Sequence, residues 1–184
     1  MRFATLILFL LSAPGLASDF RTLDFGASCA DVVVQEIALG SKQVPPRVEG
    51  MGILAFKGQG FDRQLDFTYF CPKGVLFAGD YYFPSQPLSD SFVTYETVYK
   101  ALSAMYGAPV LDNSPLKQPS LGSRWLEEDP FKYMTTWNTP RVSVATILLR
   151  SFPEEPAGWR VAVHFGQALG VERSNTSLER TRGR

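Results

Sequence analysis

Three stretches in the first half of the chain alternate hydrophobic and polar residues with a period of two, which predicts β-strands. They cover residues 51–57, 64–71 and 75–83. A Gly-Gln-Gly sequence at 58–60 separates the first two stretches, and a Pro-Lys-Gly sequence at 72–74 separates the last two. Glycine and proline favour tight turns, so we expect the three strands to follow one another as an antiparallel meander.

Three further stretches in the second half show strand patterns, at 131–137, 142–149 and 159–165. In the last stretch two sets of residues alternate: Trp159, Val161, Val163 and Phe165 on one side, and Arg160, Ala162 and His164 on the other. This alternation is typical of a sheet with one covered face.

The segment between Ser28 and Gly40 is predicted to be a helix. Ser28 and Asp31 stand at the spacing of a capping box, in which each side chain accepts a hydrogen bond from the other's backbone. Apolar residues recur at helical spacing at positions 33, 34, 37 and 38, and Gly40 is a natural C-terminal stop. The three consecutive valines at 32–34 favour a strand, so both interpretations stay open.

A longer helix is predicted to follow the prolines at positions 84 and 87. An apolar stripe at helical spacing runs along it: Phe92, Tyr95, Val98, Leu102 and Met105, with Tyr99 and Tyr106 beside it. Gly107 ends this helix, and Pro109 prevents its continuation. Residues 110–123 are rich in proline, serine and glycine and are predicted to form an exposed loop.

The predicted order is helix, three strands, helix, three strands. This order predicts an α+β fold, in which an antiparallel sheet of five to six strands carries both helices on one face. It also suggests an α-β-β-β unit that is used twice. The pattern leaves open whether the two halves share one continuous sheet or form two adjoining sheets.

Residues 1–17 are predicted to be a secretory signal peptide. Arg2 gives a positive start, residues 3–11 are almost entirely apolar, and the small residues Gly15 and Ala17 mark a cleavage site after Ala17. A transmembrane anchor is the first alternative, but the apolar run is too short to cross roughly 30 Å of hydrocarbon. A buried first strand is the second alternative.

The mature chain is then expected to consist of one domain, 18–170, and a polar, basic tail, 171–184. The tail carries four arginines and few apolar residues, so it is predicted to be disordered. No later segment reaches about 18 consecutive apolar residues, so no integral membrane segment is expected in the mature chain.

Cys29 and Cys71 are the two cysteines of the chain, and export to an oxidising compartment would allow them to pair. A disulfide would close a loop of roughly 40 residues and stabilise the fold by about 4 kcal/mol on the chain-entropy model. Two buried free thiols are the alternative interpretation.

Charge and residue chemistry exclude several functions. The formal net charge is zero and the domain has no cluster of lysines and arginines, so nucleic acid is not an expected partner. His164 is the one histidine, and no nucleophile motif accompanies it, so no catalytic triad is predicted. The two cysteines and one histidine do not suffice for a zinc site, and no cofactor-binding motif is present.

Several acidic residues are candidates for catalysis. Asp66 and Asp80 fall within predicted strands, where they are candidates for cross-strand neighbours. Residues 127–129 (Glu127, Glu128, Asp129) and the pair at 154–155 lie in predicted loops, where acids are normally solvated. A small hydrolase that uses carboxylates from Asp66, Asp80 and 127–129 therefore remains a second hypothesis.

Aromatic residues suggest a binding surface. The chain has 14 Phe, 7 Tyr and 3 Trp, a surplus that suits a sheet. Tyr82 is predicted to point to the opposite face from its strand neighbours, and with Phe70, Trp125 and Trp137 it would form an exposed apolar patch. The alternative is that helices or the second half of the chain cover these residues.

Two resemblances concern the end of the long helix and the tail. The sequence Tyr-Gly-Ala-Pro at 106–109, followed by Trp137 and a strand ending near Leu149, resembles a pattern in small bacterial envelope proteins. It implies a sheet domain of the kind found in outer-membrane assembly lipoproteins and lactamase-inhibitor proteins, although this chain has no lipid-attachment cysteine near the cleavage site. Residues 174–184 resemble a translated recombination site at the end of an integron gene cassette, which implies that the tail's charge has no function; an anion-seeking arm is the alternative.

Export, the aromatic surplus and the missing catalytic set together predict a non-enzymatic interaction domain, periplasmic or secreted. Its contact surface would be a sheet face or the 110–123 loop. The expected partner is a protein or another envelope component. The sequence specifies neither that partner nor the oligomeric state.

Overall fold

The computed structural model describes residues 21, 23–48, 52–114, 133–151, 153 and 155–168. The predicted signal peptide, the predicted tail and Trp125 lie outside the described residues. The helices are α1 (Cys29–Ala38) and α2 (Leu88–Tyr106), with a short 3-10 helix η1 (Pro72–Gly74). The strands are β1 (Lys42–Val44), β2 (Ile53–Gly60), β3 (Arg63–Phe70), β4 (Ala78–Tyr82), β5 (Leu111–Asp112), β6 (Met134–Asn138), β7 (Val142–Arg150) and β8 (Trp159–Gln167).

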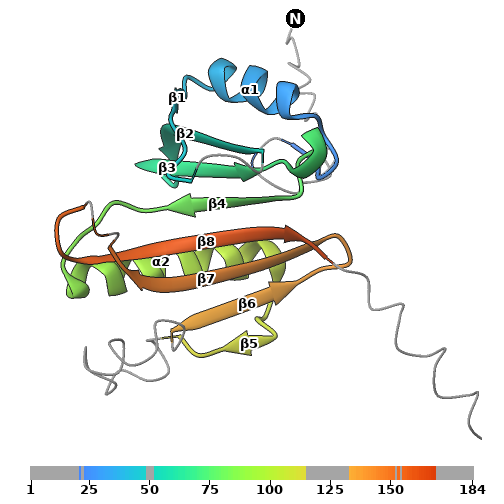
Figure 1. The fold of residues 1–184 in the computed structure, drawn as a ribbon. Helices are drawn as coiled ribbons and strands as arrows, with labels where there is room; N and C mark the ends of the chain where they lie inside the picture. Colours follow the sequence, from blue (N-terminus) through green and yellow to red (C-terminus); the bar gives the residue numbers. More distant parts are fainter. Residues whose placement is uncertain are drawn as a thin grey trace, which may run out of the picture.

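All eight of these strands form one antiparallel sheet, in the order β1-β2-β3-β4-β8-β7-β6-β5, which runs from top to bottom in Figure 1. The predicted α+β class, with two helices and an antiparallel sheet, is confirmed. The predicted number of five to six strands is wrong. Pairing of β4 with β8 joins the two halves, so they share one continuous sheet.

Two short edge strands account for the difference in number. β1 has three residues and β5 has two, which is too short for an alternating pattern to be recognised. Pro45 and Pro46 follow β1 directly and lack the N–H groups that a longer strand would need. With these strands included, the unit that occurs twice along the chain is one helix followed by four strands.

Both helices pack on the same face of the sheet, the helix side. Residues directly opposite one another across six strands form one row on this side: Phe56, Phe67, Tyr81, Val163, Thr146 and Thr135. All six are buried. The phenol of Tyr95 on α2 lies 2.9 Å from the hydroxyl of Thr135, and Glu36 on α1 accepts a hydrogen bond from Tyr69, which lies two residues after Phe67.

The helix α1 is confirmed, but the face that it buries differs from the expected one. Ser28 and Asp31 form the predicted capping box. Val32 and Glu36 point inward, whereas Val34 and Ile37 are exposed. A carboxylate can be buried here because Tyr69 donates a hydrogen bond to it and the guanidinium of Arg21 lies 2.6 Å away, so its charge is compensated.

The turn between β2 and β3 lies beyond the predicted Gly-Gln-Gly sequence. Gly58 and Gly60 remain paired in β2, and the turn is made by Phe61 and Asp62, both with positive φ. A side chain at position 58 would collide with Ser41, whose Oγ lies 2.2 Å from an ideal Cβ position. Glycine is therefore needed here for the close approach of a neighbouring segment rather than for a turn.

No described helix covers the other side of the sheet, which we call the helix-free face. One row of directly opposite residues crosses it: Lys57, Asp66, Tyr82, Ala162, Ile147 and Met134. Most of these side chains are half-buried. Neither α1 nor α2 is long and apolar enough to span a membrane.

Candidate functional site

A groove with a volume of about 530 Å³ lies on the helix-free face. Its floor is formed by β2, β3 and β4, and its walls by the segment after β1 and by Pro153. The side chains that line it on the helix-free face are those of Val44, Ile53, Ala55, Lys57, Asp66, Thr68, Phe70 and Tyr82, and the segment after β1 contributes Pro45, Pro46, Arg47 and Val48. Its volume lies within the range of small-molecule sites.

The groove is apolar at one end and charged at the other. Ile53 and Phe70 lie directly opposite each other at the apolar end, because β2 and β3 pair in this register. Four residues further along β2, Lys57 lies opposite Asp66 at the charged end, and their charged atoms are 3.3 Å apart. The strand register therefore places the two kinds of side chain at opposite ends of one surface.

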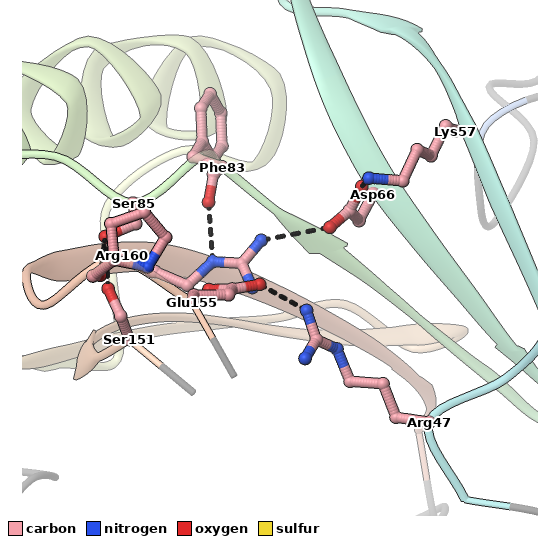
Figure 2. A network of polar contacts seen from close by, with 9 residues as sticks. Arg47, Lys57, Asp66, Phe83, Ser85, Ser151, Glu155 and Arg160 are labelled. Carbon is pink, nitrogen blue, oxygen red and sulfur yellow. Dashed lines mark hydrogen bonds and ion pairs between the residues drawn. The ribbon is translucent and has the colours of Figure 1, made fainter. Parts of the chain in front are cut away.

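A buried arginine holds the charged end in place. Arg160 on β8 is 2% exposed, and its guanidinium donates hydrogen bonds in three directions (Figure 2). It contacts the carbonyl oxygen of Phe83 at 2.7 Å, both carboxylate oxygens of Glu155 at 2.7 and 3.0 Å, and Asp66 at 3.2 Å. Since these partners come from a loop, from β3 and from the end of β4, Arg160 ties four parts of the chain together.

Further contacts extend this network toward solvent. Arg47 also binds Glu155, which joins the segment after β1 to the loop before β8. The hydroxyls of Ser85 and Ser151 bind each other nearby, as Figure 2 shows. A smaller pocket of about 340 Å³ lies against the same network and shares Lys57, Asp66 and Tyr82 with the groove. Each charged side chain of this network therefore has at least one partner of opposite charge.

A second polar cluster lies one row away on the helix-free face. Asp80 is 7% exposed, accepts a hydrogen bond from the hydroxyl of Tyr82 at 2.8 Å, and lies 2.7 Å from Nδ1 of His164. The imidazole of His164 is about half exposed. The sequence predicted no catalytic triad around His164; in the structure the buried carboxylate of Asp80 orients its imidazole.

Burial raises the pKa of several phenols. The tyrosines concerned are Tyr69, Tyr81, Tyr82, Tyr95 and Tyr133. For each of them desolvation is the largest cause, since a phenolate would lose its hydration. Neighbouring carboxylates raise the pKa further at Tyr69, through Glu36, and at Tyr82, through Asp80.

Two of the four residues predicted for an exposed aromatic patch share the groove. Phe70 and Tyr82 are both half-buried and both line it. Trp137 is fully buried: it lies on the helix side, where its indole donates to the carbonyl of Gly107 at 3.2 Å, so it is not part of this surface. Trp125 lies outside the described residues.

The carboxylates proposed for a hydrolase do not share one site in the described part of the chain. Asp66 lies opposite Tyr82, whereas Asp80 lies opposite Thr68, so the two acids are diagonal rather than directly paired. Glu155 was expected to be solvated, but it is 18% exposed and is held by two arginines. Residues 127–129 lie outside the described residues.

The two cysteines lie next to each other and are free thiols in this structure. The sulfur of Cys29 is 3.7 Å from the carbonyl oxygen of Cys71. Burial, together with the hydrogen bond to Cys29, raises the pKa of Cys71 to about 12. The disulfide stays a prediction, and the adjacency of the two residues is compatible with it.

The sequence did not reveal the groove residues Arg47 and Lys57, nor Glu155 and Arg160, which line the smaller adjoining pocket. Arg160 alternates with apolar residues in β8, and an exposed strand arginine would give the same pattern. Among the described residues, no group of three or more His, Cys, Asp or Glu side chains could hold a metal ion. Comparisons with protein-family models, curated proteins and solved structures found no match to this chain.

Proposed function

We propose that this protein is an exported binding domain of the bacterial envelope, and that its contact surface is the helix-free face around the groove. The observation that carries this proposal is the groove itself: half-buried Phe70 and Tyr82 lie beside a hydrogen-bonded network centred on Arg160. Aromatic and arginine side chains are enriched at binding surfaces.

The predicted signal peptide supports export. The absence of a recognisable catalytic set in the sequence supports a non-enzymatic role. On the helix side, both helices cover the buried rows of the sheet. The helix-free face remains available for a partner protein or another envelope component.

Photo-crosslinking in envelope extracts tests the proposal. A photoreactive phenylalanine analogue at Phe70 is expected to give a discrete, saturable adduct. The same analogue at Val93, an exposed position on α2, serves as the matched control and is expected to give none. Equal, diffuse labelling from both positions would contradict a binding function for this face.

A small hydrolase is the second candidate, and the contact between Asp80 and His164 favours it. A buried carboxylate that orients a half-exposed imidazole resembles part of a general-base arrangement. A panel of chromogenic ester and glycoside substrates tests this candidate. Turnover that is lost in both Asp80→Asn and His164→Ala would support it, and rates equal to the buffer background would exclude it for those substrate classes.

A further inference from the structure

The length of the groove limits the size of its ligand. Ile53 at the apolar end and Lys57 at the charged end are four residues apart on β2, which corresponds to roughly 13 Å along a strand. Between them, Ala55 and Thr68 lie directly opposite each other. These two side chains are short, so the middle of the groove stays open to a narrow group.

The charges around the groove are not balanced. Lys42 lies directly opposite Lys57 across β1 and β2, on the same face, and both are exposed. Like charges in directly opposite positions destabilise a sheet, so their pairing favours a nearby anion. Together with Arg47 and Arg160, these lysines give four cations.

Three carboxylates lie on the same face, Asp66, Glu155 and Asp80, the last directly opposite Thr68 of the groove. This leaves a surplus of one positive charge (four minus three) among the described residues there.

We propose that the groove binds a small anionic amphiphile, an unbranched apolar chain that ends in one carboxylate. The chain lies over Ile53, Ala55 and Phe70, and the carboxylate lies beside Lys57 and Lys42. A chain of roughly ten carbon atoms that ends in a carboxylate matches the length of the groove, since an extended chain advances about 1.25 Å along its axis for each bond. The inference rests on the proposed function and names the class of ligand for the same site.

An NMR titration of backbone amides tests the proposal with three probes that share one chain and differ in the head group: decanoate, decanol and decyltrimethylammonium. Decanoate is expected to shift amides of β2 and β3 saturably and to bind more tightly than decanol. Decyltrimethylammonium is expected to bind most weakly, because its charge is of the wrong sign. Absence of a saturable shift with decanoate, or an order in which the cation binds best, would overturn the proposal.

Variants separate the charged end from the apolar end. The double variant Lys42→Gln/Lys57→Gln is expected to weaken decanoate binding roughly tenfold, which is the loss expected for two exposed ion pairs. Decanol binding is expected to stay unchanged. Lys100→Gln is the matched control, since Lys100 is an exposed lysine on α2 that pairs with Glu96. An equal loss with decanoate and decanol would contradict the role assigned to the lysines.

Thr68→Trp fills the middle of the groove and is expected to abolish binding of both decanoate and decanol; unimpaired binding would contradict the assigned position. A urea titration confirms that each variant is folded. If decanoate does not bind while the crosslink at position 70 still forms, the ligand class is wrong and the binding face stands. If both fail, the proposed function falls with it.

Discussion

Replacing Arg160 with methionine tests the central physical claim about the site, namely that one buried guanidinium holds its charged end together. Methionine keeps much of the volume but removes every donor. The carbonyl of Phe83 would lose its hydrogen bond, and the carboxylates of Asp66 and Glu155 would each lose an ion pair. The groove wall and the floor of the sheet would no longer be connected through this side chain.

The expected decrease in the free energy of unfolding depends on how deeply the ion pairs of Arg160 are buried. Removing one partner of a fully buried ion pair typically costs about 3–5 kcal/mol. Here Asp66 and Glu155 are 30% and 18% exposed, and each retains a second cation, Lys57 or Arg47. The loss should therefore lie at the lower end, about 3 kcal/mol, which corresponds to a fall in Tm of roughly 6–12 °C for a chain of this size.

Urea unfolding followed by circular dichroism measures this difference. Arg141→Met is the matched control, since Arg141 forms an exposed ion pair with Asp24 at 3.2 Å and should cost at most about 1 kcal/mol. In the Arg160→Met background, Glu155→Gln should cost less than it does in the wild type, because its buried partner is already gone. A loss below about 1 kcal/mol for Arg160→Met would refute the reasoning.

Three further predictions concern the covalent structure, the core and the pH dependence of stability. The intact mass of the exported protein should show that residues 1–17 are removed and that two hydrogens fewer are present than in the dithiol form. Full alkylation of Cys29 and Cys71 without reductant would contradict the disulfide. Trp137→Ala should cost about 3–5 kcal/mol, and Phe70→Ala much less, in urea titrations. Desolvation raises the pKa of the buried tyrosines Tyr69, Tyr81 and Tyr95, so these phenols stay protonated in the folded state at a pH above about 10, where unfolded tyrosine ionises. The free energy of unfolding should therefore fall as the pH rises above about 10, and an unchanged urea midpoint between about pH 9 and pH 11 would exclude this.

The sequence alone was sufficient for the secondary structure wherever the pattern is long and local. The alternation in 142–149 and 159–165 predicted β7 and β8, and the glycine at position 107 marked the end of α2. These features depend on neighbours within one element, and such neighbours can be read from a single stretch of chain.

The inward face of α1 could not be predicted in this way. Apolar periodicity placed positions 33, 34, 37 and 38 inside, but Glu36 is buried and Val34 and Ile37 face outward. The carboxylate is stabilised by Tyr69, which is 33 residues away, and by Arg21. A helix with a buried charge is recognised only when its partners are known to be adjacent.

The residues of the site also come together only in the tertiary structure, because their partners are distant in the sequence. The sequence predicted an aromatic surface and correctly directed Tyr82 toward the face opposite its strand neighbours, but Trp137 went into the core. Arg160 and Asp66 are 94 residues apart, and Arg47 and Glu155 are 108 residues apart. Local periodicity determined which residues alternate along each strand, whereas strand order and register determined which charges meet, and these depend on contacts between distant parts of the chain.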